Sequence, residues 1–148
     1  MLVARRVGEG MVACTTLHDY QHPVFQQMLY RILRYLAGLS NSGQNLGVSI
    51  LGYAPSVGRT HGLGTEATAG LELRAACDIN PRRLEQARVD FPQLKTYSSI
   101  DEFAADAAID LVIIATPPNT HAELAIAMMA AGKHVISEKP LAISRRET

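Results

Sequence analysis

Residues 46–61, LGVSILGYAPSVGRTH, decide the fold of this chain. The apolar run 46–51 stops at Gly52, and Gly58 follows six residues later, at the start of helix-compatible sequence. A strand, a glycine-containing turn and a helix present backbone N–H groups to a phosphate. The stretch departs from the dinucleotide fingerprint G-x-G-x-x-G, because Ala54 takes the second glycine position when Gly52 is the anchor. Taken alone, the pattern also fits an ordinary strand-to-helix turn.

An acidic residue follows the next apolar run. Asp78 comes directly after 71–77, twenty residues beyond Gly58. A carboxylate at this place accepts hydrogen bonds from the adenosine ribose hydroxyls, and it repels a 2′-phosphate, which favours NAD over NADP. The nearby Arg82 and Arg83 leave NADP open. The structural alternative is an aspartate that caps the next helix, but the spacing from the glycine turn favours the ribose role.

Two polar motifs follow later strands. The loop TPPNTH, residues 116–121, comes after an apolar strand, and the tripeptide EKP, residues 138–140, comes after the next one. Ligands gather at the carboxyl edge of an open parallel sheet. Lys139 beside a reacting hydroxyl would assist hydride transfer through its charge or as an acid/base partner. Taken alone, the first motif also fits a rigid capped turn, and the second an exposed charged turn.

Residues 46–148 alternate predicted strands with predicted helices. The order of elements and the short links between them predict an α/β fold, a Rossmann-type doubly wound parallel sheet. We expect strands at 46–51, 71–77, 95–97, 110–115 and 134–137, and helices from about 57, over 81–90, from Ser98 or Ser99 to 107, and over 120–131.

The first forty residues predict an N-terminal hairpin-plus-helix extension of this fold. Residues 1–16 read as a hairpin around Gly8-Glu9-Gly10, and apolar residues at three- and four-residue steps predict a helix over 24–39. The small polar stretch that follows reads as a linker. We therefore divide the chain into residues 1–40, a linker at 41–45, and residues 46–148.

Composition excludes several classes of partner. Fourteen basic residues balance fourteen acidic ones, so no overall positive field attracts nucleic acid or an anionic membrane. Aromatic residues make up 5% of the chain, too few for platforms on which bases stack. No run reaches membrane-spanning length, and the N-terminus lacks the apolar core of a signal peptide. We expect neither a nucleic-acid nor a membrane partner.

Cysteine and histidine usage gives no sign of a metal site. Cys14 and Cys77 form no C-x-x-C pair, which argues against a disulfide framework or zinc and fits a cytoplasmic location. His18, Asp19 and His22 lie close together, but no further ligand follows at a diagnostic spacing. We expect a polar loop there and no bound metal.

Taken together, the motifs resemble the N-terminal domain of the Gfo/Idh/MocA oxidoreductases. The resemblance covers 46–148 and is most specific in the block IDLVIIATPPNTHAELAIAMMAAGKHVISEKPLA. It implies a nicotinamide dinucleotide cofactor, NAD with NADP left open. It also assigns sites: the pyrophosphate turn at Gly52, Ala54 and Gly58, the ribose acid Asp78, the cofactor loop Thr116, Pro117 and His121, Glu138 near the nicotinamide ribose, and Lys139 near the reacting carbon as the catalytic residue.

The first segment resembles the C-terminal end of ThuA-like domains, which have a class I glutamine-amidotransferase-like fold. The matching residues are Gly8-Glu9-Gly10, the run from Thr15 to Asp19, His22-Pro23, and the helix that closes at Gly38. The family usually has a glycine before the His-Asp pair, where this chain has Leu17. The resemblance implies that residues 1–40 are the tail of such a domain.

The resemblance also implies what the complete enzyme does. It would move a hydride between NAD(P) and a hydroxyl or carbonyl carbon of a sugar, cyclitol or related polyol. The family's C-terminal domain supplies the substrate pocket, the remaining acid/base residues and usually the homo-oligomer interface, so we expect residues 1–148 alone to be inactive. Two alternatives stay open: a non-catalytic dinucleotide-binding module, and an inactive remnant that binds nothing.

Overall fold

A computed structural model describes residues 2–7, 10–15 and 45–140 of the chain. The predicted helix 24–39 and the residues His18, Asp19 and His22 lie outside this part. The elements are β1 (Leu2–Val7), β2 (Gly10–Thr15), β3 (Leu46–Leu51), α2 (Val57–Glu66), β4 (Leu71–Cys77), α3 (Pro81–Asp90), β5 (Lys95–Tyr97), α4 (Ile100–Ala105), β6 (Leu111–Ile114), the 3-10 helix η1 (Pro118–Thr120), α5 (His121–Ala130) and β7 (His134–Ser137).

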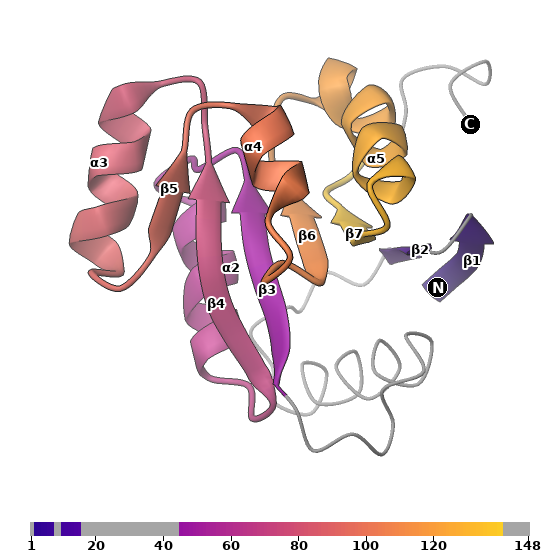
Figure 1. Ribbon diagram of the computed structural model, residues 1–148, viewed down its shortest axis with the longest axis horizontal. Coiled ribbons are helices and arrows are strands. Elements are labelled where there is room, and N and C mark those ends of the chain that lie inside the picture. Colours follow the sequence, from indigo (N-terminus) through magenta and orange to yellow (C-terminus); the bar gives the residue numbers. More distant parts are fainter. Residues whose placement is uncertain (1, 8–9, 16–44, 141–148) are drawn as a thin grey trace.

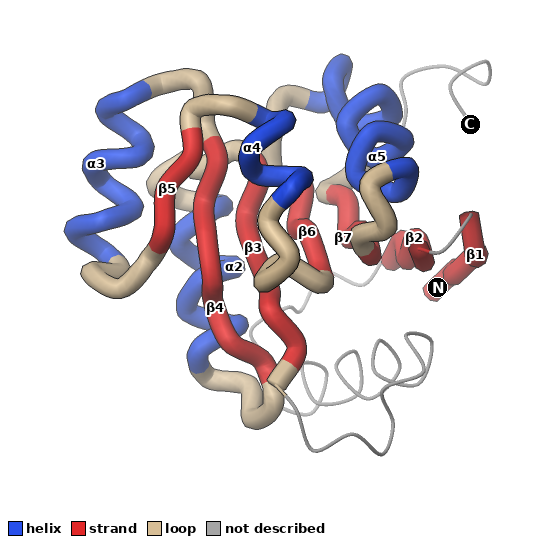
Figure 2. Tube along the Cα trace, viewed as in Figure 1, coloured by secondary structure: helices blue, strands red, loops and turns tan. Residues whose placement is uncertain are grey.

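The strands form one seven-stranded sheet in the order β1-β2-β7-β6-β3-β4-β5 (Figure 1). Strands β3 to β7 are mutually parallel, which confirms the Rossmann-like α/β prediction. The predicted hairpin is present, since β1 pairs antiparallel with β2, and β2 lies parallel to β7. The carboxyl ends of the five parallel strands share one edge of the sheet, and a loop follows each strand there (Figure 2).

Apolar side chains cover both faces of the parallel strands, which is why β3 and β6 are buried along their whole length. Helices α4 and α5 lie in front of the sheet and α2 lies behind it (Figure 1). Phe103 of α4 and Met128 of α5 are fully buried in the front core. Behind the sheet, Tyr53 packs with Ile50 and Phe91. The glycine turn is therefore part of the rear core.

Local chemistry sets the ends of the helices. Helix α3 begins with Pro81 at its first position, and Asn80 caps it by accepting a hydrogen bond from the N–H of Arg82. The prediction that α4 reaches residue 107 was wrong, because the helix ends at Ala105. Asp106 is extended, and its carboxylate accepts the N–H of Ala108, a local turn that competes with helix continuation.

Helix α2 continues through two internal glycines, Gly62 and Gly64, although glycine lowers helix stability. A Cβ at Gly62 would lie 2.5 Å from the ring of Phe91, so the small residue lets α2 approach the end of α3. The middle of α2 therefore lies close to Phe91 and to Leu73 of β4.

Candidate functional site

Gly52 ends β3 and sets the direction of the turn. Its φ is +91°, a conformation that other residues rarely adopt. A Cβ at this position would lie 2.8 Å from the backbone N of Thr116 and 2.9 Å from the carbonyl carbon of Ala115. Because backbone atoms have no room to give way, only glycine lets the turn lie against the loop after β6. The structure thus places two predicted site residues, Gly52 and Thr116, side by side.

The turn between β3 and α2 offers backbone N–H groups. Gly58 donates to the carbonyl of Ala54 at 2.8 Å, and Ser56 at the N-cap makes no side-chain capping bond. No described residue accepts a hydrogen bond from the N–H of Ser56 or Val57, and both residues are exposed. The start of a helix with open N–H groups is suited to an anion such as a phosphate.

Ala54 fits this turn without strain. Among the described residues, only glycines have positive φ, so Ala54 adopts an ordinary backbone conformation. The turn has one more residue than the fingerprint allows, and Gly58 rather than a second glycine makes the tight approach. A Cβ at Gly58 would lie 3.0 Å from the Cα of Tyr53.

Tyr53 anchors the turn in the hydrophobic core behind the sheet. Its side chain is fully buried, and its hydroxyl donates to Oδ2 of Asp90 at 2.6 Å. Burial first, and then this hydrogen bond, raise the pKa of Tyr53 well above its ordinary value, so the hydroxyl keeps its proton. Asp90 also meets Arg59 of α2, with Nε 3.5 Å from Oδ1. The turn and α2 are thus tied to the end of α3.

Asp78 lies directly beneath the turn. It is 5% exposed, and its Oδ2 accepts the N–H of Tyr53 at 2.8 Å. Its Oδ1 accepts the N–H of Asn80 at 2.8 Å, and Arg83 approaches Oδ2 at 3.4 Å. Asp78 is not the cap of α3, since Asn80 fills that role. Its contacts instead couple the end of β4 to the glycine turn.

The loop after β6 is held from behind by a buried histidine. His121 is 1% exposed, with Nε2 2.8 Å from the carbonyl oxygen of Thr116 and Nδ1 2.7 Å from that of Pro140. Thr120 donates its hydroxyl to Oγ1 of Thr116 at 2.7 Å. Pro117 is exposed at the tip. His121 therefore joins the TPPNTH loop to the EKP loop and lies behind the surface that a ligand would meet.

The EKP loop presents one carboxylate and one ammonium group. Oε1 of Glu138 lies 2.8 Å from Nε2 of His61 in α2, and Oε2 accepts the N–H of Lys139 at 3.3 Å. The hydrogen bond from His61 is the largest cause that lowers the pKa of Glu138, against the opposing effect of its burial. Lys139 is exposed, and no described residue forms an ion pair with its ammonium group. The Lys139–Pro140 peptide is cis.

The predicted residues thus form one connected set along the carboxyl edge. Direct contacts link the glycine turn to Asp78, and His121 links the loop after β6 to the loop after β7. Two residues were missed by sequence reasoning, Tyr53 and His61. The position of His61, three residues after Gly58, could be read from the sequence, but it did not indicate that Glu138 is the partner of His61. The burial of Tyr53 gave no sequence signal, because Tyr is equally common on surfaces.

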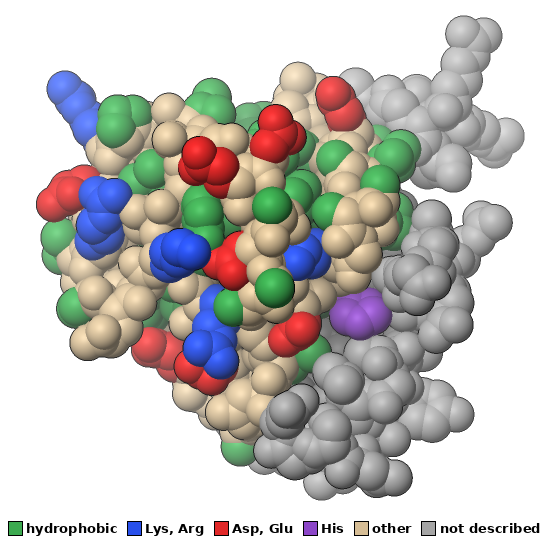
Figure 3. Space-filling model, viewed as in Figure 1, with side chains coloured by type: hydrophobic (Ala, Val, Ile, Leu, Met, Phe, Trp, Pro, Cys, Tyr) green, Lys and Arg blue, Asp and Glu red, His purple; other side chains and the backbone are tan. Residues whose placement is uncertain are grey.

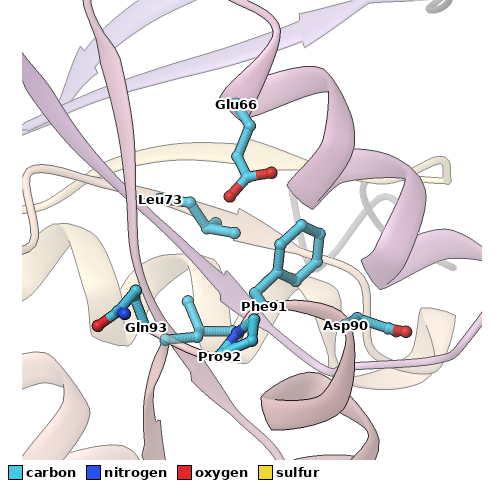
Figure 4. A pocket seen from close by; sticks show the side chains of 7 residues that line it. Glu66, Leu73, Asp90, Phe91, Pro92 and Gln93 are labelled. Atoms are coloured by element: carbon cyan, nitrogen blue, oxygen red, sulfur yellow. The ribbon is translucent and has the colours of Figure 1, made fainter.

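Other surfaces of the described residues show fewer features of a binding site. A pocket of about 210 Å³ lies at the opposite edge, between Glu66 of α2, Leu73 of β4 and the loop 90–94 (Figure 4). Acidic and basic side chains are interspersed on the face shown in Figure 3. The described part holds no group of three or more His, Cys, Asp or Glu suited to a metal ion. None of its helices has the length and apolar character that a membrane crossing demands.

Comparison with known proteins gives a family match over the same residues. Residues 46–148 match the model of an oxidoreductase family with an NAD-binding Rossmann fold, Gfo/Idh/MocA. Among curated proteins, the chain is similar to scyllo-inositol 2-dehydrogenase (NADP(+)) IolW of Bacillus subtilis. The two are 36% identical over 100 residues, which cover 68% of this chain and 27% of the relative.

Solved structures show the same similarity. The myo-inositol 2-dehydrogenase of Lactobacillus plantarum matches with a TM-score of 0.63 and 29% identity, over 70% of this chain and 31% of that protein. GenD2 from gentamicin A biosynthesis, whose structure is a complex with NAD, matches with a TM-score of 0.65 and 31% identity, over 70% and 29%. The chain therefore spans less than one third of the length of these relatives.

Proposed function

The chain belongs to the Gfo/Idh/MocA oxidoreductases, and we propose that residues 46–148 bind NAD for a dehydrogenase that acts on a CH–OH group of a sugar, cyclitol or polyol. The observation that carries this proposal is the turn from Gly52 to Gly58, with open N–H groups at Ser56 and Val57 and the Asp78 carboxylate locked beneath it. An anion site beside a ribose acceptor is the arrangement that a dinucleotide requires. The inositol dehydrogenases among the relatives support the substrate class.

Each predicted residue takes one part of the cofactor. The turn that contains Gly52, Ala54 and Gly58 faces the pyrophosphate, and Asp78 faces the adenosine ribose. Thr116 and Pro117 line the cofactor on the side of the loop after β6, with His121 as their support from behind. Glu138 faces the nicotinamide ribose. The position of these residues at the carboxyl edge of the sheet supports this proposal.

The bound dinucleotide would supply a hydride acceptor for a carbon that carries a hydroxyl group. We propose Lys139 as the catalytic residue on this chain, because its ammonium group is exposed and forms no ion pair with a described carboxylate. A cation there stabilises the negative charge that develops on the substrate oxygen. We propose that residues outside this chain's cofactor domain supply the substrate pocket, as the family resemblance implies.

NAD is the preferred cofactor in this proposal. The Asp78 carboxylate lies where a 2′-phosphate would approach, and like charges repel. Arg83 partly offsets this charge, at 3.4 Å from Oδ2, and its side chain is 43% exposed. We therefore expect the affinity for NADP to be lower than the affinity for NAD, but NADP should still bind.

The remaining assignments concern the whole protein. We propose that residues 1–40 are the tail of a ThuA-like domain, that 41–45 is a linker, and that 46–148 is the cofactor domain. We further propose a cytoplasmic homo-oligomer with a small-molecule substrate and no nucleic-acid or membrane partner. The balanced charge of the sequence supports the last point.

Calorimetric titration of the 148-residue chain with NAD and with NADP tests the cofactor proposal. We expect NAD to bind, and Asp78→Asn to weaken it about tenfold, because the amide keeps the size of the side chain but loses a charged acceptor. Asp78→Asn should also reduce the difference between the affinities for NAD and for NADP. Arg82→Gln, in the exposed part of α3, serves as the control for NAD.

The result that would overturn the proposal is a folded chain, verified by circular dichroism, that binds neither dinucleotide. Such a chain would fit the inactive-remnant alternative. Equal affinity of the Asp78→Asn variant and the unchanged chain for NAD would remove Asp78 from the site.

A further inference from the structure

Two side chains from distant parts of the sequence meet beside the EKP loop. Nε2 of His61 lies 2.8 Å from Oε1 of Glu138, across 77 residues of sequence. His61 is on α2, three residues after Gly58, and Glu138 follows β7. Strand β6 separates β7 from β3, the strand that leads into α2. The pair therefore joins helix α2 to the EKP loop, and the strands that lead into these two segments, β3 and β7, are not neighbours in the sheet.

The contact fixes the carboxylate of Glu138 at a defined place. Its backbone N–H donates to the carbonyl of Ile114 at 2.9 Å, and its Oε2 accepts the N–H of Lys139. The side chains of His61 and Glu138 are only 15% and 22% exposed, so water competes little for either partner. An exposed ion pair would add little to stability or order, whereas a partly buried one can hold a side chain in one rotamer.

A fixed acceptor binds a hydroxyl group more tightly than a mobile one. Glutamate is among the side chains that lose most rotamer freedom when they are ordered, and a side chain that becomes ordered only on binding lowers the affinity. If His61 orders Glu138 before any ligand arrives, this loss does not reduce the affinity. The two oxygens of a carboxylate have several acceptor positions, so the contacts with His61 and Lys139 leave capacity for a ligand.

We propose that His61 is a positioning residue: it holds the Glu138 carboxylate as a fixed acceptor for a ribose hydroxyl on the nicotinamide side of the dinucleotide. The inference rests on the proposed dinucleotide site and goes beyond it, because it joins the helix of the pyrophosphate turn to the nicotinamide end. His61 touches no ligand in this role and acts through Glu138.

The test compares NAD with ADP as ligands of the 148-residue chain. ADP shares the adenosine and the pyrophosphate with NAD but has no second ribose, so it does not extend to Glu138. We expect His61→Leu to weaken NAD by about fivefold to tenfold. Its affinity for ADP should change less than about twofold, since the turn and Asp78 are intact. The ratio of the two affinities separates positioning from mere support of α2.

Three further variants sharpen this comparison. His61→Gln keeps an N–H donor and should restore most of the NAD affinity. Glu138→Gln should cost at least as much as His61→Leu, because it changes the acceptor itself. The double variant should cost no more than Glu138→Gln alone, because His61 acts only through Glu138. Leu63→Ala, an exposed position on the same helix, should leave both affinities unchanged.

Each other outcome is decisive. Equal losses for NAD and ADP would show that His61 only stabilises α2, and an unchanged NAD affinity in His61→Leu would show that the contact has no role; both overturn the positioning proposal. If the unchanged chain binds ADP but not NAD, the nicotinamide side of the site is wrong and His61 has nothing to position. If it binds neither ligand, the proposed function itself fails.

Discussion

At the scale of single residues, Gly52 shows why a strand-end glycine can be required by the fold as well as by a ligand. Its backbone has a positive φ, and a Cβ would collide with the backbone of residues 115 and 116. Gly132 also has a positive φ, +78°, but a Cβ there would meet no atom within 4 Å. A comparison of the two glycines therefore separates two effects of a substitution. One is the strain of a positive φ, and the other is the steric clash of the added Cβ.

We predict that Gly52→Ala destabilises the chain by about 2 kcal/mol more than Gly132→Ala. Both variants carry the strain of an alanine at positive φ, about 1–2 kcal/mol. Only the first adds an overpacked contact, worth about 1–3 kcal/mol. Urea unfolding followed by circular dichroism measures both differences. Similar costs for the two variants would mean that the turn moves away from Thr116 without penalty.

Ala54, in contrast to Gly52, occupies a position in the turn that does not require glycine. Sequence comparison with the fingerprint makes it a departure that threatens the close approach of a phosphate. In the structure the turn reaches the helix with one additional residue, and none of the described non-glycine residues has a positive φ. The departure therefore changes the path of the turn and leaves the N–H groups of Ser56 and Val57 without a protein acceptor in the described part.

At the scale of elements, the glycine turn and α2 behave as a unit anchored by Tyr53. The backbone N–H of this residue holds Asp78, and its hydroxyl holds Asp90 at the end of α3. One buried residue thus joins the ends of β3, β4 and α3. The hydrogen bond of the backbone N–H positions Asp78 at the proposed cofactor site. The hydrogen bond of the hydroxyl stabilises the core behind the sheet.

We predict that Tyr53→Phe separates these two functions. The loss of the hydroxyl removes one hydrogen bond to a charged group and should cost about 1.5–3 kcal/mol in free energy of unfolding. The affinity for NAD should change less than about twofold, because the N–H of residue 53 still donates to Asp78. Urea unfolding and calorimetry on the same sample check both parts. A large loss of NAD affinity with little loss of stability would contradict the division.

Much of the element pattern was predictable from local sequence. The bounds of β3, β4, β5 and β7 agree with the prediction. The clearest case is β3, an apolar run that ends at Gly52. Helix α4 was predicted two residues too long, since the turn at Asp106 depends on its own side chain. The link between His61 and Glu138 lies beyond prediction from one sequence, because neither residue carries a local sign of its distant partner.

At the scale of the whole molecule, the parallel sheet brings the motifs together. Gly52, Asp78, Thr116 and Glu138 each follow a different strand, and the shared direction of those strands places all four at one edge. The order β7-β6-β3-β4 then sets the loops in a row, with the glycine turn between the EKP side and the Asp78 side. An extended dinucleotide with two riboses and a central pyrophosphate suits such a row.

The hairpin adds to this picture. Strand β2 lies parallel to β7, so the first segment of the chain extends the sheet on the EKP side. Its strands were predicted as a hairpin from the glycine-rich turn at 8–10, but its place beside β7 was not, because strand pairing over more than 120 residues leaves no local signal. The pocket at 90–94 lies at the other edge and remains separate from the proposed site.

The measurement that tests the central claim most directly is a titration of the isotope-labelled 148-residue chain with NAD, followed by two-dimensional amide NMR. Our account predicts shifts of the backbone amides at 52–54, 56–58, 78–80, 116 and 138–139, with the amides of 91, 93 and 94 unaffected. Shifts centred on 91–94, or none in a chain whose spectrum is that of a folded protein, would contradict the claim that this edge of the sheet is a dinucleotide site.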